Sequence, residues 1–104
     1  MSDRLYDILM QTPLGRRSGT MQIRIADFRI SGTLAIMKHS EPFEGTVDSD
    51  GNCTIRGLLV TLLRRIPYTA VGTIRDDTLR LSLTGERNTF EIRGTAQHGE
   101  VPLR

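Results

Sequence analysis

The sequence predicts an all-β fold, and three observations lead to that prediction: a recurring Gly-Thr pair, a period-two alternation of apolar residues, and short connections made of turn-forming residues. The pair recurs at Gly19-Thr20, Gly32-Thr33, Gly45-Thr46, Gly72-Thr73 and Gly94-Thr95. With Gly57 and Gly85 in the gaps of this series, a glycine returns roughly every dozen residues, which is the spacing of successive short strands in a barrel or sandwich.

The alternation is clearest between Phe28 and Thr46, where large apolar residues share one parity and polar residues the other, as in a strand with one buried face. Glycines lie on the apolar parity in several strands: Gly19, Gly32, Gly45, Gly72 and Gly94. A glycine that faces inward lets a strand bend or lets another backbone approach closely. Repeated around a sheet, such glycines favour closure.

We expect eight strands, separated by short runs of Gly, Asp, Asn and neighbouring polar residues. Their approximate bounds are Leu5–Thr12, Ser18–Ala26, Phe28–Met37, Pro42–Asp48, Cys53–Leu63, Ile66–Ile74, Thr78–Thr84 and Thr89–Gln97. Connections this short enforce antiparallel neighbours, because a parallel crossover needs a dozen residues or more. The strands therefore form a meander.

Eight meandering strands close naturally into an up-and-down barrel without a free edge. A loose internal match between the stretches from Gly19 and from Gly72 favours two four-strand halves, roughly 4–48 and 53–97. The fold class that we predict is an eight-stranded antiparallel meander barrel, calycin-like, in one domain over residues 1–104, and the alternative is a two-sheet β-sandwich.

The inward parity carries enough apolar bulk to fill a small barrel, so we expect a packed core ahead of an open pocket. The expected inward residues are Met21, Ile23, Ile25, Phe28, Ile30, Leu34, Ile36, Phe43, Val47, Ile55, Leu59, Ile66, Tyr68, Ile74, Leu79, Leu81, Leu83, Phe90 and Ile92. Inward glycines remove volume and could leave a hollow at one level. With few polar groups on this parity, a ligand in the interior would have to be mostly apolar.

Composition narrows the class of protein. The 104 residues carry 14 Lys and Arg against 12 Asp and Glu, scattered along the chain, a balance that favours solubility over a polyanionic partner. The opening MSDRLYDILMQTP has no signal-peptide pattern, and no apolar run is long enough to span a bilayer. Cys53 is the one cysteine and cannot form an intrachain disulfide. We therefore expect a cytoplasmic protein that does not act at a membrane.

Several motifs resemble a known group of folds: TPLG at 12–15, GTMQI, ISGTL, PFEGTV followed by a D-G turn, IPYTAVGTI and a closing FEIRGTA. Over residues 5 to 96 they resemble small bacterial calycin-like barrels of unknown function, which are lipocalin- and avidin-like in architecture. The resemblance implies the barrel and carries over no functional residue. A weaker likeness, through the strand order and the closing GTAQHGEVPLR, is to dimeric lipocalin-like negative regulators of type III secretion, which bind another protein; this chain lacks their acidic surface cluster.

Motifs for catalysis or metal binding are missing. There is no GxSxG, P-loop, HExxH or paired-cysteine spacing, so we expect no enzyme, no metal and no cofactor. Asp48 to Asn52 begins like a calcium loop, but its glycine comes one place early and no bidentate glutamate follows, so a hairpin turn is the better interpretation. His39, Glu41 and Glu44 fit a solvated loop better than an acid-base group. Cys53 is expected to be a small, buried and inert thiol.

Five arginines share the outward parity: Arg24, Arg29, Arg56, Arg80 and Arg93. A basic sheet that binds nucleic acid usually adds aromatic rings on the same face for base stacking. Here Phe28, Phe43, Tyr68 and Phe90 are all expected to point with the core. This distribution argues against a nucleic-acid partner.

The clearest departure from the pattern is GLLVTLL at 57–63, where Leu58, Val60 and Leu62 are expected to face outward together. Exposed contiguous apolar surface usually marks a contact with another protein, so these residues are the predicted interface of a homodimer. The alternative is that the N-terminal segment, apolar on both parities, folds over them. Two functions follow: a non-enzymatic binding module for a small apolar ligand or a protein partner, or a self-associating structural or regulatory protein that acts through its outer face.

Overall fold

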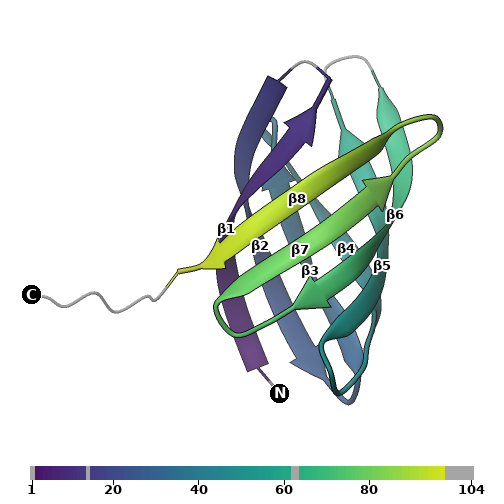
Figure 1. Cartoon of the computed structure of the whole chain (residues 1–104). Coiled ribbons are helices and arrows are strands. Elements are labelled where there is room, and N and C mark those ends of the chain that lie inside the picture. The colour runs from purple at the N-terminus through teal and green to yellow at the C-terminus, as the bar shows by residue number, and fades with distance from the viewer. Residues whose placement is uncertain (1, 14, 62–63, 98–104) are drawn as a thin grey trace, which may run out of the picture.

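The computed structural model describes residues 2–13, 15–61 and 64–97, and they form a closed barrel of antiparallel strands (Figure 1). The strands are β1 (Ser2–Thr12), β2 (Gly15–Ala26), β3 (Arg29–Ile36), β4 (His39–Val47), β5 (Asn52–Val60), β6 (Arg65–Ile74), β7 (Thr78–Thr84) and β8 (Thr89–Ala96). Each strand pairs with the next one along the chain, and β1 closes the ring by pairing with β8. The predicted meander barrel is confirmed, and the sandwich alternative is wrong.

The core fills the inside of the barrel because the strands alternate as the sequence predicts. On β8, for example, Phe90 and Ile92 are buried, whereas Glu91 and Arg93 between and beside them are exposed. No polar or charged residue is buried among the described residues. Ile25 and Ile66, which we expected inside, are partly buried and pack against the core cluster. The described part of the chain forms no helix, and so none that could cross a membrane.

The glycines of the inward parity allow neighbouring backbones to approach closely. A β-carbon on Gly72 would overlap the carbonyl oxygen of Arg80 on β7, and one on Gly45 would overlap that of Thr54 on β5. A β-carbon on Gly94 would instead lie 2.9 Å from the Leu79 side chain inside the barrel. Most of these glycines therefore serve the tight curvature of the wall, which agrees with their expected role in closure.

The prediction that Phe28 begins a strand and faces the core is wrong. Asp27 and Phe28 form a two-residue turn, with Ala26 and Arg29 paired on either side. Their φ angles are 53° and 62°, and the Phe28 side chain is 66% exposed. Because a reversal of this kind interrupts the pleat, the alternation restarts after the turn, and Phe28 does not share the parity of β3.

The N-terminal segment does not fold over the fifth strand, as one alternative required. It is the barrel strand β1, paired with β2 on one side and with β8 on the other. Tyr6, Ile8 and Met10 are buried in the core, whereas Leu5 and Leu9 are exposed on the outer face. The sequence could not separate these faces because both parities of this segment are apolar.

Candidate ligand-binding cleft

Two hairpins extend beyond their neighbours at the upper end of the barrel in Figure 1. The β1–β2 ladder continues to Thr12, although the pairing of β2 with β3 ends at Gly19. The β5–β6 ladder continues to Val60, although the pairing of β4 with β5 ends at Gly57. In a ring of eight strands these two hairpins stand on opposite sides, so their inner faces enclose a cleft.

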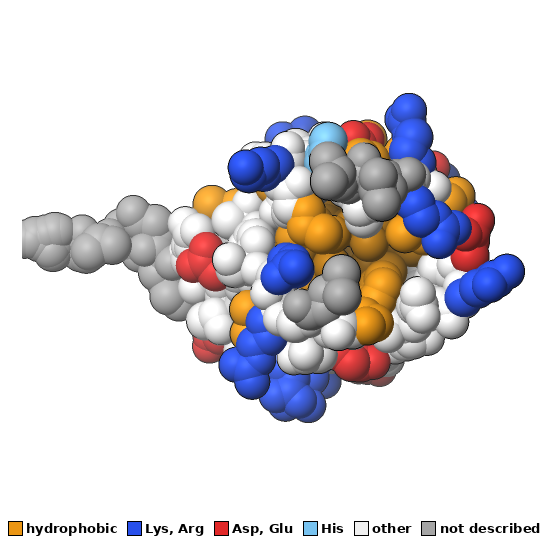
Figure 2. All heavy atoms as spheres, turned by 90° about the horizontal axis from the view of Figure 1, so that it is seen from above, with side chains coloured by type: hydrophobic (Ala, Val, Ile, Leu, Met, Phe, Trp, Pro, Cys, Tyr) orange, Lys and Arg blue, Asp and Glu red, His pale blue; other side chains and the backbone are white. Residues whose placement is uncertain are grey.

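The cleft has a volume of about 570 Å³. All four connections at this end, or the strands beside them, contribute to its lining, whose described residues are Met10, Thr12, Pro13, Arg17, Met37, Leu59, Thr61, Arg64, Ile66, Asn88 and Phe90. Figure 2 looks onto this end and shows hydrophobic side chains gathered at its centre, with basic side chains and polar groups around them.

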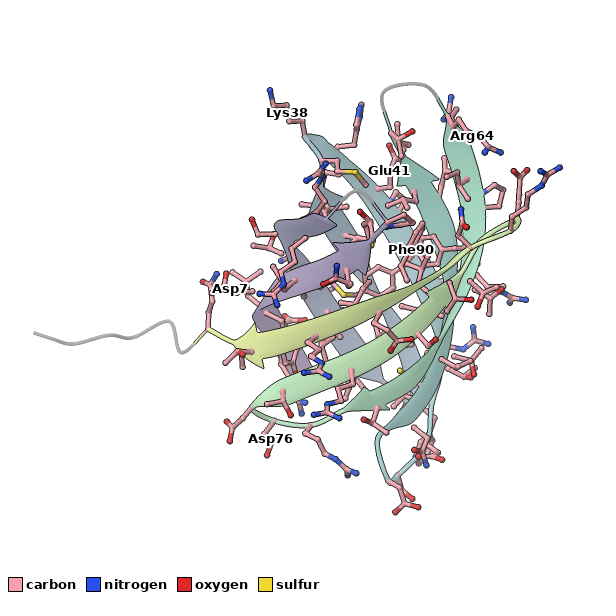
Figure 3. All side chains as sticks on the ribbon, turned by 45° about the horizontal axis from the view of Figure 1, so that its top comes forward. Asp7, Lys38, Glu41, Arg64, Asp76 and Phe90 are labelled. Atoms are coloured by element: carbon pink, nitrogen blue, oxygen red, sulfur yellow. The ribbon has the colours of Figure 1, made fainter. Side chains whose placement is uncertain are left out.

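The walls of the cleft are an upward continuation of the core. Met10, Leu59 and Phe90 belong to the buried core cluster, and Met37 and Ile66 pack against that cluster while remaining partly exposed. Figure 3 shows Phe90 directed into the barrel interior, whereas Arg64 lies at the tip of the β5–β6 hairpin. The expectation of a packed core therefore holds for the middle of the barrel, and the apolar hollow lies at this end.

The charged groups of the lining are both cations. Arg64 forms an ion pair with Glu86 in the β7–β8 turn, whereas Arg17 forms no ion pair with any described residue. None of the residues that line the cleft is an Asp or Glu. Glu41 lies on the inward parity of β4, where it pairs with Leu34, but it does not line the cleft.

Met37 occupies the tight turn between β3 and β4 in a conformation that few side chains favour. Its φ is 54° and that of Lys38 is 67°, both in the left-handed region that suits Gly, Asn and Asp. Strain of this kind persists where the surrounding structure maintains it, and it is concentrated at functional sites. Here the strained residue is a methionine that forms part of the cleft wall.

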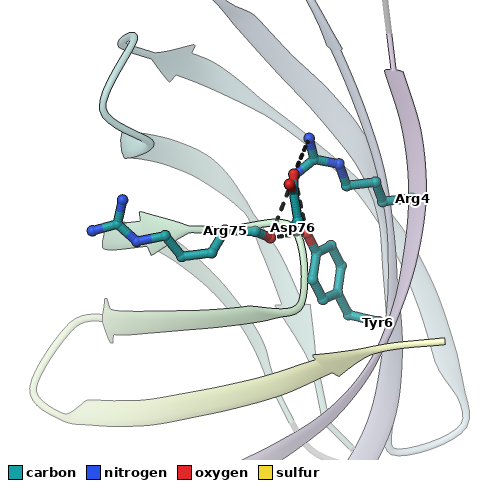
Figure 4. Close-up of polar contacts among 4 residues, drawn as sticks. All are labelled: Arg4, Tyr6, Arg75 and Asp76. Atoms are coloured by element: carbon teal, nitrogen blue, oxygen red, sulfur yellow. Dashed lines mark hydrogen bonds and ion pairs between the residues drawn. The ribbon is translucent and has the colours of Figure 1, made fainter. Parts of the chain in front are cut away.

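The opposite end of the barrel is closed by hydrogen bonds (Figure 4). The hydroxyl of the buried Tyr6 donates to the carbonyl oxygen of Arg75, at 2.6 Å, and accepts a longer bond from Arg4. Arg4 also forms an ion pair with Asp76 in the β6–β7 turn, 3.1 Å between nitrogen and oxygen. These contacts tie β1 to a turn about 70 residues later in the chain.

A second cavity, also of about 570 Å³, lies at this closed end, and its character differs. Charged and polar residues of the turns make up most of its lining: Arg4, Asp27, Asp48, Ser49, Asp50, Arg75 and Asp76, beside a few apolar groups. Its acids and arginines are partly paired with one another, as in the Arg4–Asp76 ion pair. No group of three metal-ligating side chains occurs in the part of the chain that the structure describes.

Two of the three predicted interface residues lie within the described structure. Leu58 and Val60 lie on the outer parity of β5, as expected, and both are partly buried. Leu62 lies outside the described residues. The more exposed outer apolar side chains are Val71 on β6 and Leu5 and Leu9 on β1. Association through Leu58 and Val60 stays a prediction.

The Asp48 to Asn52 segment forms the hairpin turn that the sequence favoured. The Asp48 carboxylate accepts hydrogen bonds from the backbone N–H groups of Asn52, at 3.0 Å, and Asp50, at 2.8 Å, and one from the Asn52 side chain. These bonds, those of Asn52 first, lower the pKa of Asp48. The oxygens of this carboxylate therefore organise the turn.

Cys53 is buried, as predicted. Burial, and to a lesser extent the charge of Asp48, raises the pKa of its thiol to about 11. Because the thiolate is the reactive form, Cys53 is a protonated and unreactive group at neutral pH.

The remaining candidates are not brought together into a site. Glu44 faces outward opposite Arg56, whereas Glu41 lies on the other parity of β4, so the imagined group with His39 does not form. The outward arginines are all exposed: Arg24, Arg29, Arg56, Arg80 and Arg93. Phe43, Tyr68 and Phe90 are buried as expected, and Phe28 is the aromatic residue for which that prediction is wrong.

Sequence reasoning missed the cleft, but one signal pointed to it. Arg17 has the same parity as Gly19, Met21 and Ile23, and it pairs with the buried Met10. A charged side chain on the inward parity of a barrel strand is expected only where the interior opens to solvent. Extending the β2 alternation toward its start would therefore have located an open end.

Comparison with protein-family models, with curated proteins and with solved structures finds no match to this chain. The structure itself defines the class: a closed eight-stranded antiparallel barrel with an apolar cleft at one end and a hydrogen-bonded closure at the other.

Proposed function

We propose that this protein is a non-enzymatic binding module that takes a small, mainly apolar molecule into the cleft between the β1–β2 and β5–β6 hairpins. The observation that carries the proposal is the cleft itself, about 570 Å³ and walled by Met10, Met37, Leu59, Ile66 and Phe90. Small-molecule sites are concave, about 300–1,000 Å³ in volume, mostly apolar, and equipped with a few polar groups. The cleft meets each of these criteria.

The composition of the lining supports binding over catalysis. Acid-base chemistry draws mainly on His, Cys, Asp, Glu, Lys or Tyr side chains, and a Ser or Thr nucleophile needs a base beside it. Among the described residues that line the cleft, Thr12 and Thr61 are the hydroxyl groups, and none is a His, Cys, Asp, Glu, Lys or Tyr that could act as their base. Cys53 and Tyr68, the two groups whose pKa burial raises, are protonated at neutral pH, and neither lines the cleft.

The architecture supports the same proposal. An eight-stranded barrel has an interior just wide enough either for its own side chains or for one small ligand. The closed meander, and the motifs that resemble those of calycin-like barrels, support the proposal that the protein is a barrel of this kind. In this proposal the middle of the barrel is filled and the ligand occupies the open end.

The test is fluorescence titration with N-phenyl-1-naphthylamine, a neutral apolar probe. We expect saturable binding by the natural sequence and a loss of about fivefold in affinity for Met37→Asn, because the substitution removes part of an apolar wall worth about 1 kcal/mol. Asn tolerates positive φ, so the turn should remain folded. Phe28→Asn is the matched control, since Phe28 occupies the corresponding kind of turn at the closed end.

Two results would overturn the proposal: an absence of saturable binding, or an equal loss of affinity in Met37→Asn and Phe28→Asn. Thermal unfolding of both variants shows whether the fold is intact. A change confined to Met37→Asn places the probe in the cleft.

A second candidate is self-association through the outer face, favoured by the partly exposed Leu58 and Val60 on the projecting part of β5. Native mass spectrometry of protein purified from cells separates the two candidates. A retained small-molecule mass supports the cleft, whereas a dimer without added mass supports self-association.

A further inference from the structure

The chemical class of the ligand can be narrowed, on the premise that the cleft is the binding site. We infer that the cleft selects a free single-chain amphiphile with a carboxylate head, its tail among Met10, Leu59 and Phe90 and its head against the guanidinium of Arg17.

Arg17 is a cation of the cleft lining. It pairs with Met10 in the β1–β2 ladder, on the inward parity, and it lines the cleft. The preceding residue, Arg16, has the opposite parity and lines a groove on the outer face with Glu91 and Arg93. The two arginines thus give the same strand one cation inside the cleft and one outside it.

Arg17 forms no ion pair with a described residue. The Arg17 guanidinium donates a hydrogen bond to the carbonyl oxygen of Arg16 at 3.3 Å, and none of the described residues that line the cleft carries a carboxylate. Arg17 is exposed, so its attraction for an anion beside the apolar wall exceeds that in bulk water only modestly and is partly screened by solvent. Its planar fork of N–H donors matches the two oxygens of a carboxylate.

The charges of the cleft lining favour a particular charge on the head group of the ligand. Arg64, the other cation among the described lining residues, already forms an ion pair with Glu86, so within the described lining one positive charge is left without an ion pair. A carboxylate supplies one negative charge, whereas a phosphate monoester carries about −1.5 to −2 at neutral pH. Charge balance therefore favours the carboxylate.

The apolar lining and the volume of the cleft suit the tail of such a ligand. The apolar lining continues from the rim into the buried core cluster through Met10, Leu59 and Phe90, and the cleft volume of about 570 Å³ suits one chain of modest length. Arg17 comes from the projecting part of β2, above this floor. A head at the rim and a tail pointing down the barrel satisfy both regions at once.

The experiment measures the dissociation constants of decanoate, 1-decanol and decyltrimethylammonium by displacement of N-phenyl-1-naphthylamine at neutral pH. We expect decanoate to bind about tenfold more tightly than decanol, which corresponds to one charge-assisted contact at a partly exposed site, and the cationic compound to bind most weakly. High salt should weaken decanoate binding and leave decanol binding unchanged.

Arg17→Gln should bring decanoate to the affinity of decanol, and Arg16→Gln should preserve the difference. The two variants change the same charge on the same strand, so they separate the cleft from the general field of the surface. Equal affinities of decanoate and decanol, or equal losses in the two variants, would overturn the carboxylate inference and leave the binding module standing. If neither compound nor the probe binds, the proposed function itself fails.

Discussion

The two ends of this barrel differ in whether the interior is closed off from solvent. At one end the Tyr6 hydroxyl, Arg4 and the Arg75–Asp76 turn close the interior with hydrogen bonds and an ion pair. At the other end the β1–β2 and β5–β6 hairpins extend beyond the neighbouring strands, and apolar side chains line the space between them. Closure contributes stability, whereas an open apolar end offers a surface that a ligand can cover. The two roles are therefore separated along the barrel axis.

Each end also contains a two-residue turn with positive φ at both positions, Asp27-Phe28 at the closed end and Met37-Lys38 at the open end. The local strain is similar, but the strained side chains meet different surroundings. Phe28 is 66% exposed and borders the largely polar cavity of the closed end, whereas Met37 packs against the core cluster and lines the apolar cleft. The surroundings, rather than the strain alone, therefore identify Met37 as part of a site.

The largest expected difference concerns the glycines of the wall. In Gly72→Ala the new methyl group overlaps the backbone carbonyl of Arg80, which cannot move without shifting β7. In Gly57→Ala it meets the end of the Tyr68 side chain, the hydroxyl oxygen at 2.6 Å, which can turn away. We expect Gly72→Ala to lower the free energy of unfolding by about 3 kcal/mol and Gly57→Ala by about 1 kcal/mol or less, measured by urea denaturation. Equal losses of free energy of unfolding in the two variants would contradict the expectation that the Arg80 backbone is rigid while the Tyr68 side chain can adapt.

A smaller effect separates the two buried tyrosines. Tyr6→Phe removes the hydrogen bond to Arg75 and should lower the free energy of unfolding by about 1 kcal/mol. Tyr68→Phe should be close to neutral, because no hydrogen bond joins the Tyr68 hydroxyl to another described residue. Thermal unfolding at neutral pH measures both, and a drop in melting temperature of about 4–8 °C is expected for Tyr6→Phe alone. The hydrogen-bonded closure would lose its support if Tyr68→Phe were the more damaging change.

The smallest effects are expected from titration. The lowered pKa of Asp48, against an ordinary value of 3.8, stabilises the fold above that value, and this contribution is lost as the pH falls through the lowered pKa. Burial raises the pKa of Tyr68 from 10.0 to about 12, so the fold is stabilised below pH 10 and this contribution is lost as the pH rises toward 12.

Melting temperatures across the pH range test both contributions. Asp48→Ala should be less stable than the natural sequence at neutral pH, with a gap that narrows in acid. Tyr68→Phe should match the natural sequence at neutral pH and exceed it above pH 10. A constant gap for Asp48→Ala, or no alkaline gain for Tyr68→Phe, would show that these groups do not couple to folding as their surroundings indicate.

The strand order, the antiparallel meander and most of the core could be predicted from the amino-acid sequence. These follow from local chemistry: the parity of residues such as Ile30 and Leu81, the inward glycines, and turns too short for a crossover. The prediction failed at Phe28, where a two-residue turn interrupts the parity, and in the segment from Leu5 to Met10, where both parities are apolar and local pattern holds no information about direction.

The position of the open end of the barrel could not be predicted from the sequence, because it depends on how the strands pair around the whole ring. The cleft exists because the β2–β3 ladder stops at Gly19 and the β4–β5 ladder stops at Gly57, while the hairpins beyond them continue. Those end points depend on the register between strands, which is set by the closure of the whole ring. In the same way, Tyr6 meets Arg75 across 69 positions of the chain, a distance that no local pattern can bridge.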